Sequence, residues 1–180
     1  MFAFRKIRLS DAKLTMDWRV QPEINRYLLT DVEYDLEKQE AWLRRIVALP
    51  ETMSWVIEYA SQPIGVVNLA DYNPDLKTTS WGWYIGELKY SRLGGFVPPC
   101  LYNYLFYERA SDLEKIEGPV FSENINVIRM HEIHGYREVE MKKRQMVKNG
   151  VSHEIVWMEL LRADWDARQH RYGNYVATFE

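Results

Sequence analysis

The strongest indication of the fold comes from residues 84–105, which read Tyr-Ile-Gly-Glu-Leu-Lys-Tyr-Ser-Arg-Leu-Gly-Gly-Phe-Val-Pro-Pro-Cys-Leu-Tyr-Asn-Tyr-Leu. It begins as a strand, passes through a glycine loop and continues into an apolar-faced helix. Gly94 and Gly95 let main-chain N–H groups approach an anion, and the positive end of the following helix favours negative charge there. Arg92 adds a fixed cation at the mouth of the loop. The pattern indicates a pyrophosphate site, although an ordinary tight turn also uses glycine.

Other phosphate and metal motifs are excluded by spacing. The loop lacks the Gly-Lys-Ser/Thr ending of nucleoside-triphosphate loops, and the Gly-x-Gly-x-x-Gly dinucleotide fingerprint is missing. His131 and His134 lie in a His-Glu-x-His sequence, which does not place two ligands one helical turn apart. We therefore expect no metal.

The bulk properties indicate an ordinary globular enzyme or binding protein. The chain has 180 residues, a net charge of −3, and 14% aromatic residues. This balance gives no reason to expect a nucleic-acid or membrane partner, and the short basic run 142–144 is read as a solvated face. A single cysteine, Cys100, excludes an internal disulfide. With no signal-like or membrane-spanning run, we expect a cytoplasmic protein.

Hydrophobic periodicity predicts one mixed α/β domain over residues 1–165 and a C-terminal tail over 166–180. We expect antiparallel N-terminal strands, a central βαβ crossover and a C-terminal hairpin that turns at Asn149-Gly150. Ser10 is the expected N-cap of the first helix. The predicted elements are strand 4–9, helices 11–20, 22–27 and 36–47, strands 54–59, 64–70 and 78–85, a loop over 92–99 opening a helix to about 112, strand 116–122, helix 125–134, strands 136–147 and 151–161, and a short helix then frayed chain over 163–180.

The glycine loop resembles the coenzyme A loop of GNAT acetyltransferases, which usually reads Arg/Gln-x-x-Gly-x-Gly/Ala and leads into a Leu-rich helix. Arg92 and Gly95 match, and Val97 departs from the usual Gly or Ala. Pro98 and Pro99 replace residues that ordinarily offer N–H groups, which raises the question of affinity, although proline is tolerated in a first helical turn. The resemblance implies acetyl-CoA or another short acyl-CoA as co-substrate, held by Arg92, Gly94, Gly95, Phe96 and Val97.

A second resemblance lies in Asn124-Ile-Asn-Val-Ile-Arg-Met-His131-Glu-Ile-His-Gly-Tyr136, which is similar to the family's Asn-x-x-Ala-x-x-Leu-Tyr-x-x-x-Gly-Phe segment. The counterpart of Asn124 contacts the cofactor arm. The tyrosine that often protonates the leaving thiolate falls on His131, and an ordinary histidine pKa near 6.5 suits that task. The alternative is a structural histidine at the edge of the core.

A third resemblance extends the match over about residues 4–165. Residues 18–30, 40–43 and the hairpin 55–69 are similar to one GNAT branch, with its Trp-Arg-Asn-x-Pro-Glu-x-Arg segment. That branch contains the amino-sugar N-acetyltransferases of the pseudaminic-acid pathway and the ribosomal-protein N-terminal acetyltransferases. The resemblance implies an amine acceptor, preferably the amino group of a nucleotide-linked amino-dideoxy sugar.

The family's chemistry implies further site residues. Splayed strands open a V in which main-chain groups of Trp83, Tyr84 and Ile85 pair with the pantetheine arm. Ser80 stands where many relatives have a glutamate base, so Ser80, Asn68 and Glu123 are candidates for ordering a water that removes the amine proton. Candidates for the acceptor pocket, which compete with a purely structural reading, are Trp18, Arg19, Tyr27, Asn68 and Trp81.

Two other functions stay open at this point. One is peptide or protein N-terminal acetylation. The other is a degenerate, non-catalytic GNAT module, which Val97, the two prolines and the missing strand glutamate would favour. A homodimer, the acyl group and the exact acceptor also remain open.

Overall fold

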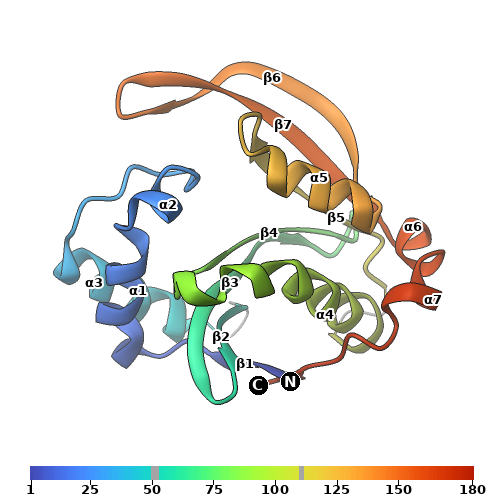
Figure 1. Ribbon diagram of the computed structural model, residues 1–180, viewed down its shortest axis with the longest axis horizontal. Coiled ribbons are helices and arrows are strands. Elements are labelled where there is room, and N and C mark those ends of the chain that lie inside the picture. Colours follow the sequence, from blue (N-terminus) through green and yellow to red (C-terminus); the bar gives the residue numbers. More distant parts are fainter. Residues whose placement is uncertain (50–52, 110–111) are drawn as a thin grey trace. The chain divides into compact units, whose positions relative to one another are not determined.

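The computed structural model describes residues 1–49, 53–109 and 112–180, with the main chain alone over 142–145. The predicted solvated face of residues 142–144 thus lies outside the described side chains, and the expected end of the long helix falls on 110–112, of which 110 and 111 are outside too. The elements, drawn in Figure 1, are β1 (Phe2–Lys6), α1 (Ala12–Arg19), α2 (Pro22–Asn25), α3 (Leu36–Ala48), β2 (Ser54–Tyr59), β3 (Gln62–Asn73), β4 (Thr78–Ile85), α4 (Val97–Asn103), β5 (Lys115–Phe121), α5 (Ile125–His134), β6 (Arg137–Lys148), β7 (Val151–Leu161), α6 (Arg162–Asp166), α7 (Gln169–Tyr172) and β8 (Thr178–Phe179).

The chain forms two compact units. The N-terminal unit contains Met1–Ala70, Gly82–Gly94 and Ala177–Glu180, and the C-terminal unit contains Asp71–Trp81 and Gly95–Val176. Strands β3 and β4 contribute residues to both. The predicted mixed α/β class is confirmed, whereas the boundary at residue 165 and the splay of the central strands stay predictions.

In the N-terminal unit the strand order is β4-β3-β2-β1-β8. Strand β2 lies antiparallel to β1 and to β3, and β8 lies parallel to β1. The predicted strand 54–59 is confirmed residue for residue. The first strand begins and ends earlier than predicted because a 3₁₀ turn, Leu9–Asp11, precedes α1. Ser10 lies inside this turn and is not the N-cap; instead the Asp11 carboxylate accepts from the Arg8 N–H at 2.7 Å.

The helices of this unit cover an aliphatic core. Asp35 caps α3 by accepting from the Lys38 N–H at 2.9 Å, and Leu43, two turns along, is completely buried. The core cluster also contains Trp18, Ile24 and Val56. Burying such side chains is worth about 1.5–3 kcal/mol each, so the amphipathic pattern that predicted α3 also holds it against the sheet.

The C-terminus forms part of the N-terminal unit. The Phe179 ring stacks on Phe4 at 4.2 Å and meets the Trp55 ring edge-on at 5.6 Å. The Glu180 N–H donates to the Phe4 carbonyl at 3.0 Å, and Trp55 Nε1 donates to the Glu180 carbonyl at 3.1 Å. The expectation of frayed chain at this end was wrong, because two aromatic rings and strand pairing anchor the last residues.

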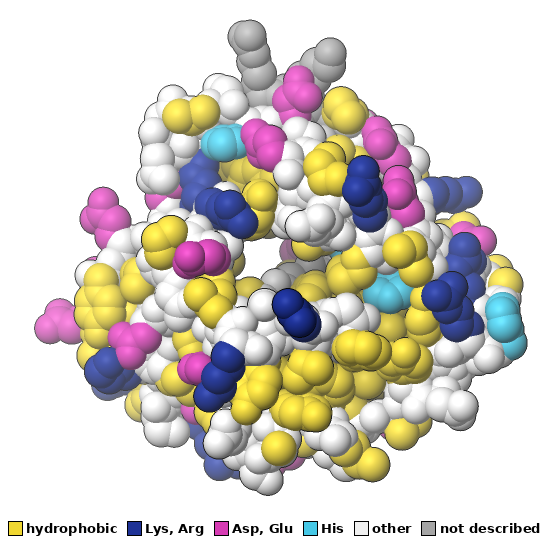
Figure 2. All heavy atoms as spheres, in the orientation of Figure 1, with side chains coloured by type: hydrophobic (Ala, Val, Ile, Leu, Met, Phe, Trp, Pro, Cys, Tyr) yellow, Lys and Arg dark blue, Asp and Glu magenta, His cyan; other side chains and the backbone are white. Residues whose placement is uncertain are grey.

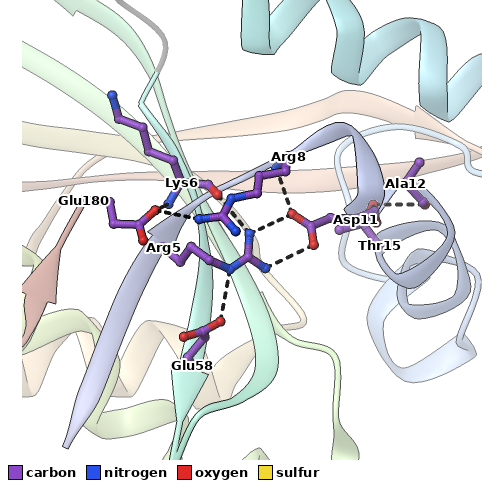
Figure 3. Close-up of polar contacts among 8 residues, drawn as sticks. All are labelled: Arg5, Lys6, Arg8, Asp11, Ala12, Thr15, Glu58 and Glu180. Atoms are coloured by element: carbon purple, nitrogen blue, oxygen red, sulfur yellow. Dashed lines mark hydrogen bonds and ion pairs between the residues drawn. The ribbon is translucent and has the colours of Figure 1, made fainter.

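A charged network lies beside this strand (Figure 3). The Arg5 guanidinium donates to both Asp11 carboxylate oxygens at 3.0 Å and to Glu58 Oε1 at 3.0 Å. The side chain of Arg5 is 15% exposed and that of Asp11 10%. The hydrogen bond and charge of Asp11 raise the pKa of Arg5, with a smaller contribution from Glu58. Each charge in this network is therefore paired.

In the C-terminal unit the strand order is β6-β7-β5-β4. The hairpin of β6 and β7 turns at Asn149 and Gly150, whose φ angles of 48° and 75° are those of a type I′ turn. Strands β4 and β5 pair in parallel from Thr78↔Lys115 to Ser80↔Glu117. This parallel pair confirms the predicted crossover.

The segment after β4 is more helical than expected. Residues Leu88–Phe96 form 3₁₀ turns rather than an open loop, α4 follows at once, and a π-helical stretch, Tyr104–Arg109, continues it. Pro98 and Pro99 fall in the first turn of α4, where their missing N–H groups would lack a helical partner in any case.

Figure 2 shows basic and acidic side chains next to each other at several places on the face drawn. Among residues 1–49, 53–109 and 112–180, no helix has the length and apolarity to cross a membrane.

Candidate functional site

The two glycines of the loop differ in their surroundings. A Cβ added at Gly94 would lie 3.1 Å from the Trp83 ring, a tight contact within the N-terminal unit that only a small shift of the ring would relieve. A Cβ at Gly95 would meet nothing within 4 Å. Neither residue has a positive φ. Gly95 is exposed, so the loop offers an accessible main chain at this residue, and Arg92, three residues earlier in the sequence, is also exposed.

Val97 points away from that accessible surface. Its side chain is completely buried, as are Pro98 and Pro99. The departure from Gly or Ala at this position is therefore accommodated by the core, and the prolines remove N–H donors from the first turn without filling the space over Gly95.

The β4 residues expected to bind the pantetheine arm lie in the N-terminal unit. Ile85 is buried, and burial raises the pKa of Tyr84 above its usual range. Gly65 is required here, because a Cβ would lie 2.2 Å from the Tyr84 carbonyl oxygen. The side chains of this stretch are thus engaged in packing, consistent with a contribution from the main chain.

Asn124 stands at the start of α5, as predicted. Its carbonyl accepts from the Val127 and Ile128 N–H groups at 3.0 and 3.1 Å. Its side chain makes no capping hydrogen bond. The helix ends at Gly135, whose φ of 102° is the left-handed conformation expected of a helix-terminating glycine.

His131 is buried in the C-terminal unit, 5% exposed. Its ring lies 4.4 Å from the Tyr136 ring and 5.9 Å from the Trp81 ring. Burial, and then the charge of His134, lower the pKa of His131 to about 3. The ordinary pKa on which the acid hypothesis depended is therefore absent, and the imidazole is neutral at pH 7.

His131 belongs to a group of contacting rings, all buried except the half-buried Trp81, that we call the aromatic–histidine cluster: Trp81, Tyr102, His131, His134, Tyr136, Trp165 and Tyr172. Trp81 Nε1 donates to the Tyr136 hydroxyl at 3.0 Å. Three buried polar atoms have no hydrogen-bond partner among the described residues: the Tyr102 hydroxyl and Nδ1 of both histidines. Within the same residues, no group of three or more His, Cys, Asp or Glu is arranged to hold a metal.

The three candidates for ordering a water differ in their hydrogen-bond partners. Ser80 Oγ donates to Asp71 Oδ2 at 2.9 Å, and Glu123 lies 3.0 Å from His153 Nδ1. Asn68 belongs to the other unit, where its buried side-chain oxygen has no partner within the described part of the chain.

Trp18 and Tyr27, two acceptor-pocket candidates of the N-terminal unit, differ in how far protein covers them. Trp18 is 2% exposed, its ring lies against Gly86, and its Nε1 donates to Glu87 at 3.1 Å. The face that was to stack on a ligand is thus covered by protein. Tyr27 is half-buried, with the Arg26 guanidinium 4.7 Å from its ring centre.

Arg19 is held in place by neighbours that sequence reasoning missed. Its Nη1 donates to Gln39 Oε1 at 2.8 Å, and its guanidinium lies 6.0 Å from the Trp42 ring centre. Gln39 is 4% exposed and lies one turn before Leu43 on the buried side of α3. A polar residue on an apolar helix face was the available signal. Glu87 carried none, because nothing in its local sequence pairs it with Trp18.

A mixed sheet with a central crossover, a glycine loop that opens a helix, and a following α5 preceded by Asn124 are the features on which the resemblance to the GNAT acetyltransferases depends. Residues 2–137 match the family described as "Acetyltransferase (GNAT) domain". This is more than half of the chain, and the chain therefore belongs to the GNAT acetyltransferases. Its activity class is that of an N-acyltransferase that depends on acyl-CoA.

Solved structures share the fold. The spermidine N-acetyltransferase of Vibrio cholerae, in complex with CoA and spermine, is 18% identical with a TM-score of 0.81, covering 91% of this chain and 97% of its own. A protein titled a probable acetyltransferase is 17% identical with a TM-score of 0.77, covering 91% and 94%. These identities establish shared architecture alone. Comparison with curated proteins gives no match.

Proposed function

We propose that this enzyme transfers an acetyl or other short acyl group from coenzyme A to the amino group of a nucleotide-linked amino-dideoxy sugar. The donor diphosphate lies over Gly95 and beside Arg92, where the main chain is accessible. Main-chain groups of Trp83–Ile85 hold the pantetheine arm. No metal takes part.

The reaction is direct attack of a neutral amine on the thioester. The nitrogen forms a bond to the acyl carbon, the carbon–sulfur bond breaks, and the products are an amide and coenzyme A. The amine loses one proton to water ordered near Ser80 and its partner Asp71, and the thiolate takes up one proton from water. An amine on a sugar carbon is less basic than lysine, so a weak base suffices.

His131 stands at the position of the family's thiolate-protonating tyrosine. With a pKa of about 3 it is a neutral imidazole, so it acts by donating its remaining N–H to the developing thiolate rather than as an imidazolium acid. His131→Phe then lowers kcat about 100- to 1,000-fold and leaves the Kd for acetyl-CoA unchanged, with Ile133→Ala, which alters an exposed residue of the same helix, as control. An unchanged kcat would remove this role.

The observation that carries the acceptor proposal is Arg19. A guanidinium fixed by Gln39 and placed near the Trp42 ring suits a phosphate joined to a ring, whereas a polycation would be repelled. Arg26 beside Tyr27 repeats the combination of cation and aromatic ring in the same unit.

A second acceptor class is favoured by a different observation. The segment between α2 and α3 exposes Asp31, Glu33 and Asp35, followed by Glu37 in the first turn of α3. Carboxylates attract a polyamine. The solved structures that are named as spermidine N-acetyltransferases also share this fold. Polyamine acetylation is therefore the alternative, followed by N-terminal acetylation of a peptide and by a non-catalytic module.

A panel of acceptors separates these functions. Release of coenzyme A from acetyl-CoA is followed with nucleotide-linked 4-amino sugars, with spermidine and spermine, and with peptides. We expect turnover with the sugar nucleotides, and Arg19→Met raises their KM about tenfold, with Lys13→Met, an exposed residue of the same helix, as the matched control. Turnover with polyamines that Arg19→Met leaves unchanged would overturn the acceptor proposal. Acetyl-CoA binding without any turnover would favour the non-catalytic module.

A further inference from the structure

An exposed aromatic face follows the glycine loop directly. Phe96 is 46% exposed, high for a phenylalanine in an ordered helical turn. Its ring is nearly parallel to that of Tyr175, with 11° between the planes and 6.1 Å between the centres. At this separation the rings are offset, so each keeps part of its face uncovered. Both residues belong to the C-terminal unit.

The face is held from behind by Asn103 of α4. Asn103 Nδ2 donates to the carbonyls of Tyr172 and Tyr175, both at 2.9 Å. Its Oδ1 accepts from Trp165 Nε1 at 2.9 Å and from Gln169 Nε2 at 3.1 Å. All four hydrogen-bonding positions of this amide are used. The segment that carries Tyr175 is therefore tied to the helix that the glycine loop opens.

Contacts with neighbouring aromatic rings also hold the Tyr175 side chain in place. The Tyr172 ring lies 5.6 Å from it at an angle of 63°, and Tyr172 itself stacks on the buried Trp165 ring at 5.3 Å. Because the supporting rings are already ordered, a ligand that stacks on this face pays little additional side-chain entropy.

The position of the face selects its occupant. Phe96 follows Gly95, the exposed glycine over which the proposed function places the donor diphosphate. In coenzyme A a ribose joins that diphosphate to an adenine, a flat ring system one short linker away. Stacking of a nucleic-acid base on an aromatic side chain is worth about 1–3 kcal/mol.

We propose that Phe96 and Tyr175 form a platform on which the adenine of the acyl donor stacks. This inference rests on the proposed function and deepens it. It assigns the C-terminal segment a part in donor recognition, and it makes the enzyme selective for acyl-CoA over thioesters that lack an adenosine, such as acyl-phosphopantetheine.

The test compares two donors in two variants. KM is measured for acetyl-CoA and for acetyl-4′-phosphopantetheine in the wild type, in Phe96→Ala and in Tyr175→Ala. We expect KM for acetyl-CoA to rise between about 5- and 100-fold and KM for the truncated donor to stay unchanged. Phe96→Tyr and Tyr175→Phe retain the rings and the wild-type KM. Phe2→Ala, at an aromatic pair of the N-terminal unit, is the matched control.

Binding of adenosine 3′,5′-bisphosphate, measured by calorimetry, tests the platform without turnover. We expect Phe96→Ala to weaken it by the same factor and to leave the melting temperature unchanged, because the ring is half exposed. Equal loss for both donors, or unaltered bisphosphate binding, would overturn the inference. A wild type that binds the bisphosphate but transfers no acyl group would instead count against the proposed function alone.

Discussion

The two units of this protein bury polar groups in opposite ways. The N-terminal unit pairs every charge of its Arg5–Asp11–Glu58 network (Figure 3). The aromatic–histidine cluster of the C-terminal unit contains no paired charge, and it leaves Tyr102 and two histidine nitrogens without a partner among the described residues. Removing any member of a fully paired ionic network lowers the free energy of unfolding. In a neutral cluster, removing a polar atom that has no partner costs little stability, whereas adding a proton lowers the stability.

Lowering the pH gives the largest expected difference in stability between the two regions. Burial lowers the pKa of His131 to about 3 and that of His134 to about 4. The unfolded chain protonates near pH 6.5 and the folded chain does not, so stability falls as the pH drops below that value. Between pH 7.5 and 5 each histidine removes about 2 kcal/mol from the free energy of unfolding.

Urea denaturation across this pH range measures the loss. His131→Phe and His134→Phe each flatten the dependence by about half, whereas Glu58→Gln in the other unit leaves its slope above pH 5 unaltered. Equal slopes in the wild type and the histidine variants would show that neither histidine is held neutral.

Removal of one charge from the ionic network comes next in size. Asp11→Ala leaves the Arg5 guanidinium without its bidentate partner and the Arg8 N–H without its acceptor, at a cost of about 3 kcal/mol. Asp17→Ala, which breaks the exposed pair with Lys13, costs less than about 0.5 kcal/mol. Similar losses for the two variants in urea titrations would contradict the distinction between buried and exposed pairs.

The smallest expected changes in stability come from deleting either of two hydroxyl groups in the aromatic–histidine cluster. Tyr102→Phe deletes a buried hydroxyl that makes no well-formed hydrogen bond among the described residues but interacts with the nearby Tyr136 hydroxyl, so we expect stability to change by less than about 1 kcal/mol. Tyr136→Phe deletes the acceptor of the Trp81 N–H, and we expect a loss of about 1 kcal/mol. Thermal denaturation of the two variants provides the comparison. A loss above about 1 kcal/mol in Tyr102→Phe would mean that its hydroxyl is satisfied.

Elements with a strong local signal were predicted well. The strand Ser54–Tyr59, the hairpin turn at Asn149-Gly150 and the end of α5 at Gly135 follow from side-chain alternation and from glycine conformation. The C-terminus was missed because the Phe179 ring packs against Phe4 and Trp55, which lie far away in sequence.

For the candidate site, the sequence identified the glycine segment but neither its helical conformation nor the electrostatics of the neighbouring residues. Gly94, Gly95 and Arg92 are recognisable from their spacing. The low pKa of His131 and the fixing of Arg19 by Gln39 depend on tertiary burial, which no local pattern reports. The functions of the site residues themselves stay proposals.

Calorimetric titration of the wild type and of Gly95→Ala with acetyl-CoA tests whether the donor diphosphate binds over the main chain of Gly95. A methyl group at this position meets no protein atom within 4 Å, so only a ligand bound close to the main chain can sense it. We expect Gly95→Ala to bind acetyl-CoA about tenfold more weakly than the wild type, a loss of about 1.4 kcal/mol in binding free energy, and to keep the wild-type melting temperature. Equal affinity for the two proteins would contradict it.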